Sequence, residues 1–232
     1  MNYVEYGKEN KYDDNIFFQK YSQMSRSQQG LAGAGEWETL RKLLPDFKDK
    51  RVLDLGCGYG WHCIYAMEHG ASSVVGVDIS HKMLEVAKEK THFPQVEYKC
   101  CAIEDVEFPE ESFDIILSSL AFHYVADYEI LVKKIYRILK SGGKLVFTVE
   151  HPVFTAYGTQ DWHYNEKGEI LHFPVDNYYY EGKRTDVFLG EKVTKYHRTL
   201  TTYLNTLLSN GFIINHIVEP QPPEPCVRKG TD

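Results

Sequence analysis

The sequence has little basic charge, no long apolar run and no apolar leader. Its 26 Lys and Arg residues are outnumbered by 33 Asp and Glu residues, giving a formal net charge of −7. Because Lys and Arg supply most of the affinity for phosphate backbones, this balance argues against nucleic acid as a partner. No apolar run approaches the roughly 18 residues of a membrane-spanning helix, and the first residues are polar. We therefore expect a cytoplasmic protein without a membrane partner.

The sequence also has few cysteines. There are five, two of them adjacent (Cys100 and Cys101), and none forms a CxxC pair. This pattern supports neither a disulfide framework nor a zinc site. We expect free thiols and no bound metal.

The length and composition fit one globular α/β domain over 1–232, because 43% of the 232 residues are hydrophobic and 25% are charged. Between residues 36 and 150, short apolar runs alternate with helical patterns, which predicts a doubly wound, mostly parallel sheet. We expect strands at 51–55, 73–79, 96–103, 113–119 and 144–150, and helices at 36–44, 60–69, 80–90 and 127–140.

Segments of different composition flank this core. Residues 1–35 form an aromatic, polar arm, and residues 151–197 form an insertion rich in Tyr, Phe, Trp and His. In the C-terminal part, 198–232, the pattern predicts a helix at 198–209, a strand at 212–218 and a proline-rich tail. A final strand of the sheet is short, supplied by 187–195, or absent.

The most informative segment is VLDLGCGYG at 52–60. Gly56, Gly58 and Gly60 follow a predicted strand and precede a helix. Glycine permits positive φ and close approach of a ligand to the backbone, and free N–H groups at the start of the helix face that ligand. Doubly wound folds bind nucleotides at such a turn. The alternative is a tight structural turn without a ligand.

Two departures from a dinucleotide fingerprint narrow the ligand class. The GxGxxG pattern requires glycine at position 61, which is Trp61 here, and Asp54 replaces the usual apolar residue before the first glycine. A carboxylate there repels a pyrophosphate but attracts an ammonium group. A ligand with an amino-acid end therefore fits better than NAD.

Asp78 ends the second predicted strand, 20 residues after Gly58. A carboxylate in this place can accept hydrogen bonds from both hydroxyl groups of a ribose. Alternatively, it is only a negative charge near the start of a helix that Ser80 caps.

Together these residues resemble the class I S-adenosylmethionine-dependent methyltransferases of the small-molecule, type-11 group. The resemblance covers about 48–150 and comprises, in order, VLDLGCGYG, VVGVDIS, AIEDVEFPEESFDIILSSLAFHYV and SGGKLVFTVEHP. It implies a Rossmann-like sheet of the class I methyltransferase fold, with S-adenosylmethionine (SAM) as cofactor at the carboxyl ends of the strands.

The resemblance also implies roles for particular residues. Asp54, Gly56, Cys57 and Gly58 would surround the methionine part, and Asp78 the ribose. Ile79 and Met83 would flank the adenine. Ile103 and Glu104 would line its polar edge, and Ser118 would lie near the sulfonium. Relatives often carry Asp where this chain has Ala102, which leaves adenine recognition to backbone groups, Glu104 or Asp105.

Methyl transfer from a sulfonium is an in-line displacement, so positioning of the acceptor matters most. His123, after the fourth strand, is the leading candidate for a general base, and His151, after the fifth, is second. A histidine that only shapes the pocket is the alternative, because many methyltransferases need no base.

The two flanking segments supply candidates for closing the site. The resemblance implies that the arm closes over the cofactor, with Tyr21, Met24 and Arg26 as candidates for this lid; packing on the surface is the alternative. In the insertion, we expect the substrate to meet Tyr157, Trp162, Tyr196 and His197, with Arg198 near a carboxylate or on a solvated helix face. Packing of a long insertion is the competing interpretation.

The predicted function is a SAM-dependent methyltransferase that acts on a small-molecule acceptor. The alternatives are a SAM-binding module without turnover, an NAD-linked oxidoreductase and a methyltransferase of proteins or nucleic acids. The methyl acceptor and the oligomeric state are left open.

Overall fold

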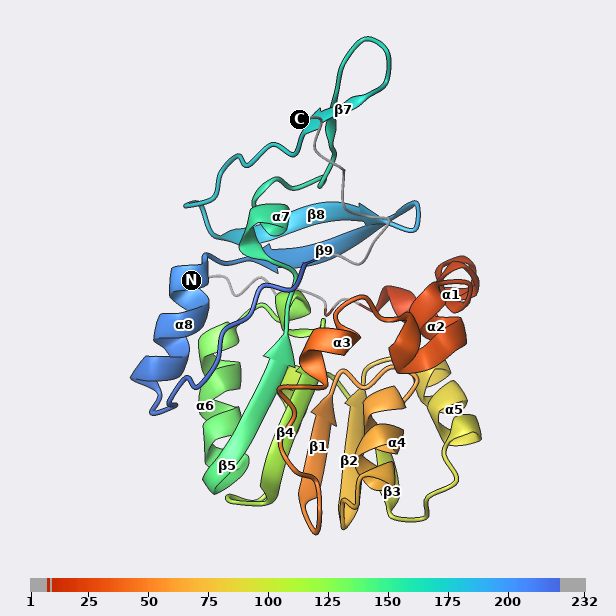
Figure 1. The fold of residues 1–232 in the computed structure, drawn as a ribbon, viewed down its shortest axis with the longest axis vertical. Coiled ribbons are helices and arrows are strands. Elements are labelled where there is room, and N and C mark those ends of the chain that lie inside the picture. Colours follow the sequence, from red (N-terminus) through yellow and green to blue (C-terminus); the bar gives the residue numbers. More distant parts are fainter. Residues whose placement is uncertain (1–7, 9, 222–232) are drawn as a thin grey trace, which may run out of the picture.

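The computed structural model describes residue 8 and residues 10–221. Its centre is a five-stranded parallel sheet in the order β3-β2-β1-β4-β5 (Figure 1). The strands are β1 (Arg51–Leu55), β2 (Ser73–Asp78), β3 (Val96–Cys100), β4 (Phe113–Ser119) and β5 (Leu139–Thr148). The predicted doubly wound α/β sheet is confirmed.

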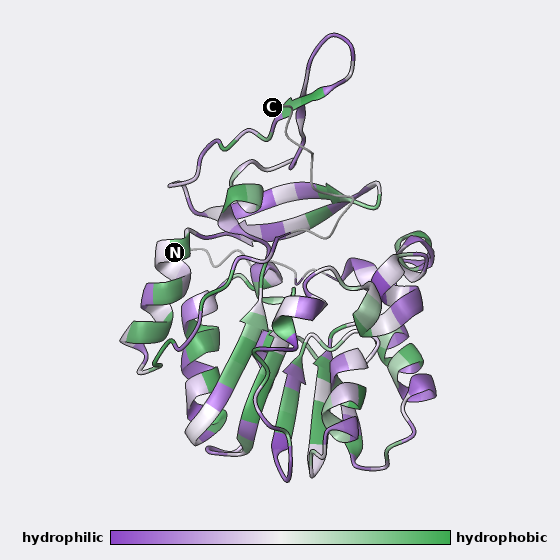
Figure 2. Cartoon of the chain, viewed as in Figure 1, coloured by the Kyte–Doolittle hydropathy of each residue, from purple (hydrophilic) through white to green (hydrophobic). Residues whose placement is uncertain are grey.

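Helices cover both faces of the sheet. On one face, α4 (Trp61–Glu68) and α5 (His81–Lys90) pack over a core that includes Val52 and Ile115. On the other face, α6 (Tyr128–Ile138) and α8 (Leu200–Ser209) pack over Leu53 and Ile116. Adjacent strand residues therefore serve opposite cores, and the strands are hydrophobic along most of their length (Figure 2).

Local capping agrees with the sequence. The side chain of Ser80 accepts a hydrogen bond from the Met83 N–H, and that of Asp127 accepts one from the Ile130 N–H. These caps satisfy N–H groups that have no partner within their own helices. They fix where α5 and α6 begin, directly beyond the carboxyl edge of the sheet.

The described part of the arm and the residues just after it run along this edge as short elements. They are η1 (Lys11–Asp13), α1 (Asn15–Ser22), α2 (Ser25–Gln29), η2 (Gly30–Gly33) and α3 (Trp37–Leu40). Asp13 Oδ1 accepts from Ser80 Oγ at 2.6 Å and from the Lys82 N–H at 3.2 Å, so the arm is fastened to the start of α5. The helix predicted for 36–44 is shorter than expected, because a turn replaces it after Leu40.

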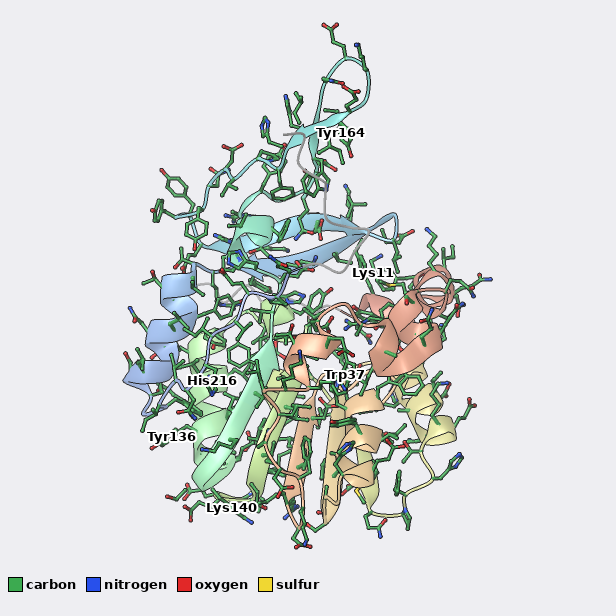
Figure 3. All side chains as sticks on the ribbon, in the orientation of Figure 1. Lys11, Trp37, Tyr136, Lys140, Tyr164 and His216 are labelled. Carbon is green, nitrogen blue, oxygen red and sulfur yellow. The ribbon has the colours of Figure 1, made fainter. Side chains whose placement is uncertain are left out.

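The insertion lies above the same edge (Figure 1). It contains α7 (Pro152–Ala156), a small hairpin of β6 (His163–Tyr164) with β7 (Ile170–His172), and a longer one of β8 (Gly182–Phe188) with β9 (Glu191–His197). Of the three alternatives for a final strand of the main sheet, the one that supplies it from 187–195 is wrong, because these residues pair within the β8–β9 hairpin. Tyr164 marks the outer end of the insertion, far from Lys140 at the opposite end of the molecule (Figure 3).

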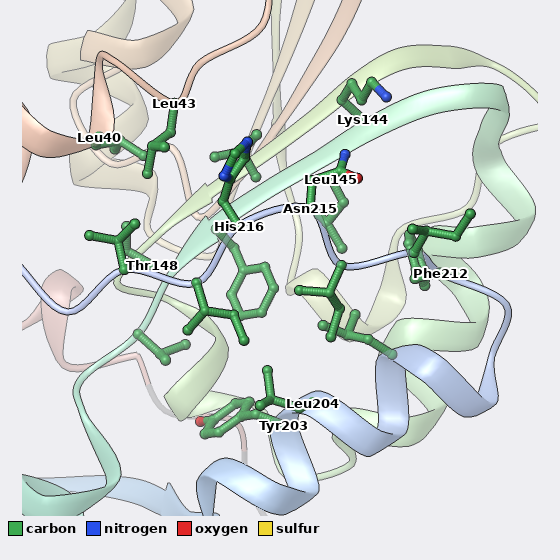
Figure 4. Close-up of a pocket in the computed structure, with 18 of the residues that line it drawn as sticks. Leu40, Leu43, Lys144, Leu145, Thr148, Tyr203, Leu204, Phe212, Asn215 and His216 are labelled. Carbon is green, nitrogen blue, oxygen red and sulfur yellow. The ribbon is translucent and has the colours of Figure 1, made fainter.

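The strand predicted at 212–218 is also wrong. Phe212 and Ile214 pack on the core, but Ile213 is 85% exposed and the segment forms no ladder with β5. The alternating pattern thus reflects one-sided packing, and a strand also requires a hydrogen-bonded neighbour. A groove of about 1580 Å³ separates this segment from β5 and α8 (Figure 4). Cys226 and the proline-rich tail from residue 222 lie outside the described residues, as do Tyr3 and Tyr6.

Candidate functional site

The glycine turn after β1 has the expected backbone. The φ angles of Gly56, Gly58 and Gly60 are 80°, 52° and 74°. A Cβ atom on Gly56 would lie 2.5 Å from that of Ala121, and one on Gly60 would collide with the Tyr98 hydroxyl, whereas one on Gly58 would have no atom within 4 Å. Glycine is therefore required for packing at 56 and 60, while Gly58 opens onto empty space.

A small cavity of about 70 Å³ adjoins this turn. Tyr21 and Arg26 of the arm line it together with Gly56, Cys57 and Gly58. The structure thus brings these two arm residues beside the turn, and that they cover a bound cofactor stays a prediction. Arg26 forms an ion pair with Glu36, which also accepts a hydrogen bond from Ser119 Oγ at 3.3 Å.

Asp54 lies buried, with 1% of its surface exposed, on β1 two residues before Gly56. Its Oδ2 faces the Cys63 thiol at 3.4 Å, and its Oδ1 has no hydrogen-bond partner in the described part of the chain. Burial raises the pKa of this carboxyl group to about 7. A buried oxygen without a donor favours a ligand that brings one, such as an ammonium group.

Asp78, at the end of β2, faces the same turn. Its Oδ2 accepts from the Gly58 N–H and its Oδ1 from the Ser80 N–H, both at 2.9 Å. Burial raises its pKa to about 6, although these backbone hydrogen bonds act in the opposite direction. The Ile79 N–H is a further backbone donor to this group, and a carboxylate with about four acceptor sites can still accept from a ligand hydroxyl.

The residues predicted at the adenine and sulfonium positions occupy the same edge. Met83 is 2% exposed, and the Ile103 Cδ1 would lie 3.4 Å from a Cβ atom on Gly56. The backbone oxygen of Glu104 accepts a hydrogen bond from Lys134 Nζ at 2.7 Å. Ser118 is buried and donates from its hydroxyl to the Leu55 oxygen at 2.7 Å, so the neighbouring Ser119 lines the cavity instead.

The two candidate histidines have different surroundings. His123 is 1% exposed; its Nδ1 accepts from the Glu150 N–H at 3.5 Å, and its Nε2 lies 3.8 Å from Glu150 Oε1. Burial lowers the pKa of His123 to about 4. His151 pairs with Glu219 at 2.6 Å and lines the outer groove beside β5.

The four residues expected at the substrate have different partners. His197 is held by Thr155 Oγ1 and by the Tyr178 oxygen, each at 2.8 Å. Trp162 packs on Phe173 at the base of the β6–β7 hairpin and is 44% exposed. Tyr157 is half-buried, and the Tyr196 ring lies 5.9 Å from the guanidinium of Arg198.

Arg198 is buried and pairs with backbone oxygens rather than with a carboxylate. Its Nη2 donates to the Val125 oxygen and, at 2.9 Å, to the Ala126 oxygen. It therefore fixes the loop that follows β4 and carries His123.

The sequence did not predict a cluster of charged side chains beside this loop. Lys195 Nζ lies 2.6 Å from Glu150 Oε1 and 2.5 Å from Asp186 Oδ2. Two signals were available: Glu150 follows β5 at its carboxyl end, and Lys195 shares the buried face of β9 with Val193. Neither signal reveals the pairing, because these residues come together only when the hairpin folds over the sheet.

A family model for the methyltransferase domain matches residues 53–147. An uncharacterised protein of Haemophilus influenzae is 36% identical over 222 residues, which cover 90% of this chain and 85% of that protein. A solved structure from Listeria monocytogenes, assigned to the S-adenosylmethionine dependent methyltransferases, is 57% identical with a TM-score of 0.78, covering 81% of this chain and 88% of that chain. The solved structure of an S-adenosylmethionine dependent methyltransferase from Mesorhizobium loti is 41% identical with a TM-score of 0.78. The match covers 84% of this chain and 88% of that chain.

The sheet and its glycine turn define a class I methyltransferase fold. With these similarities, the chain belongs to the S-adenosylmethionine-dependent methyltransferases, and its cofactor is SAM. The resemblance, fold class, enzyme class and cofactor predicted from the sequence are confirmed. No helix in residues 10–221 is long and apolar enough to cross a membrane.

Proposed function

We propose that the enzyme methylates a small-molecule acceptor at the carboxyl edge of the sheet, beside the glycine turn. One observation carries the proposal: Gly58 opens onto empty space in the turn where Asp54 keeps a buried carboxylate oxygen without a donor among the described residues and where Asp78 accepts from the Gly58 N–H. When bound, SAM supplies a methyl group on a positively charged sulfur. The protein must hold that group and the acceptor in line.

The residues present fit this cofactor. A cationic amino group would give the Asp54 Oδ1 the hydrogen bond that it lacks. The free acceptor sites of Asp78 suit ribose hydroxyl groups, and the backbone of 56–58 can approach the ligand closely. We assign the adenine to the apolar wall of Ile79, Met83 and Ile103, with Glu104 at its polar edge and Ser118 near the sulfur.

The arm has to move before a ligand of this size can bind. The cavity of about 70 Å³ is far smaller than the roughly 300–1,000 Å³ typical of ligand pockets, and Tyr21 and Arg26 of the arm line it. The arm is held at several points: Asp13 bonds to the start of α5, Lys20 Nζ donates to the Leu189 oxygen at 2.9 Å, and the buried Phe17 ring packs on that of Phe188. We propose that these contacts open to admit SAM and close over it.

In this proposal, positioning rather than proton abstraction provides most of the rate. Correct alignment of two reactants can contribute about 7–11 kcal/mol. His123, with a pKa of about 4 and both ring nitrogens facing Glu150, is a weak base in this environment. We assign it to the wall of the acceptor site, and the net charge of −7 favours small molecules over nucleic acid.

The test follows a labelled methyl group. The enzyme is incubated with SAM carrying a radioactive methyl group and with a cell extract; dialysis removes macromolecules, and chromatography separates unreacted SAM from other labelled molecules in the dialysable fraction. We expect enzyme-dependent label in the dialysable fraction, abolished by Asp78→Ala and retained by Glu97→Ala on the exposed surface of β3. Label confined to protein or nucleic acid would contradict a small-molecule acceptor.

A further inference from the structure

The cluster around Glu150 contains one group that is open to a ligand. Side-chain exposure is 28% for Glu150 but only 3% for Asp186, 3% for Lys195 and 2% for His123. Glu150 Oε1 receives the Lys195 ammonium and Oε2 receives Gln160 Nε2 at 2.9 Å. A carboxylate has about four acceptor sites, so Glu150 is fixed in orientation and still has sites for a further donor.

A series of ring contacts connects this carboxylate with the glycine turn. The Tyr59 ring, within the turn, lies 5.9 Å from that of Tyr21, and the Tyr21 ring lies 5.2 Å from that of Tyr12. Tyr12 lies 6.5 Å from Tyr124, which lies 4.4 Å from the ring of His123. These packed rings run from the glycine turn to His123, whose Nε2 lies 3.8 Å from Glu150 Oε1, so the carboxylate belongs to the same edge of the sheet as the turn.

The charges in this region select against anions. The ammonium of Lys195 is already shared by two carboxylates, and the guanidinium of Arg198 by backbone oxygens. A carboxylate or phosphate on the acceptor would find both of these cations engaged and would face Glu150. A protonated amine would gain a charged hydrogen bond from Glu150 and would be attracted by the faces of the tyrosine rings.

We propose that Glu150 binds the methyl acceptor and that the acceptor is an amine, bound as its ammonium form. This inference rests on the proposed function, because it names the substrate class of the same site. Burial favours the neutral acid, but His123, Lys195 and Gln160 outweigh it and hold the pKa of Glu150 below its ordinary value. The carboxylate is therefore ionised at neutral pH.

The reaction balances without another reagent. The ammonium first releases a proton to solvent, which leaves a nitrogen lone pair. That lone pair forms the bond to the methyl carbon while the bond from sulfur to that carbon breaks, and the sulfur keeps the electron pair as a neutral thioether. The positive charge moves to the methylated nitrogen, which stays beside Glu150.

The test uses four probes on one scaffold: benzylamine, benzyl alcohol, benzyl thiol and benzoate. Each is titrated by calorimetry, at about pH 7.5, where the amine is protonated, into protein saturated with S-adenosylhomocysteine. A charged hydrogen bond corresponds to about 10- to 100-fold in affinity. We expect benzylamine to bind that much more tightly than benzyl alcohol or thiol, and benzoate to bind most weakly.

Glu150→Gln should remove the preference for benzylamine and leave the affinity for S-adenosylhomocysteine unchanged. Glu107→Gln, an exposed carboxylate paired with Lys134, is the matched control and should keep the preference. The inference is overturned if benzylamine fails to bind, if benzoate or the alcohol binds as tightly, or if Glu150→Gln keeps the selectivity. The wild-type ranking decides the matter even if the variant does not fold. Failure of the wild type to bind S-adenosylhomocysteine would instead refute the proposed function.

Discussion

Lys195→Met is the most informative perturbation of the buried charges. The lysine lies between Glu150 and Asp186, at 2.6 and 2.5 Å, and it is 3% exposed, as is Asp186. Methionine preserves the apolar stem but leaves two carboxylates close together without a cation. Removing one partner of a buried ion pair typically costs about 3–5 kcal/mol, because the remaining charge is uncompensated.

A surface pair gives the comparison. Lys133 contacts Glu129 one helical turn away, and both side chains are more than half exposed. Such pairs contribute only about 0.3–0.5 kcal/mol. Lys133→Met should therefore leave the free energy of unfolding nearly unchanged, and the difference between the two variants isolates the effect of burial.

The assay is urea denaturation at several pH values. Because the dependence on urea is about 1–3 kcal/mol per molar, we expect the Lys195→Met midpoint to fall by at least about 1 M near neutral pH. Loss of the ammonium raises the pKa of Glu150 in the folded protein, so the destabilisation is largest above that pKa and shrinks as the pH falls through it. Adding Asp186→Asn should recover part of the loss. A cost below about 1 kcal/mol, equal to that of Lys133→Met, would refute the assignment of a strongly coupled buried cluster.

Three further predictions follow from the site. Asp54→Asn should stabilise the ligand-free protein at pH 8 by about 1–4 kcal/mol and by less at pH 5, because burial raises the Asp54 pKa to about 7 and its cost to stability grows as the pH rises from the ordinary pKa of about 3.9 to that value; a variant that melts lower at pH 8 would contradict this. Gly60→Ala should destabilise more than Gly142→Ala, since both have φ of 74° but only Gly60 faces the Tyr98 hydroxyl; equal midpoints in urea would show that the contact is unimportant. Affinity for S-adenosylhomocysteine should rise from pH 5 to 8 as Asp54 and Asp78 lose protons, and a flat calorimetric profile would exclude these carboxylates from binding.

Local sequence predicted the part of the fold that is local in origin. The strand before Gly56, the cap at Ser80 and the carboxylate of Asp78 each depend on a few consecutive residues, and all lie where the pattern placed them. Tyr21 and Arg26 also reach the turn, although the reason lay in the resemblance rather than in their own spacing. Parallel strands with short connections bring these groups to one edge of the sheet.

The remaining features depend on contacts between distant segments. Alternation at 212–218 cannot show whether a neighbouring strand is present, and this segment has none. The pairing of Glu150 with Lys195 joins residues 45 positions apart in the chain and requires the β8–β9 hairpin to fold over the sheet. The surroundings of His123 were equally hidden, because its burial depends on Arg198 fixing the loop from the far side.

The most direct test of the account is a crystal structure of the protein with S-adenosylhomocysteine bound. We expect the ligand in the crevice beside Gly58, with its ribose hydroxyl groups on Asp78, its amino group toward Asp54 and the arm closed over it. A ligand bound elsewhere, or one in that crevice with both carboxylates directed away from it, would contradict the assignment of the site.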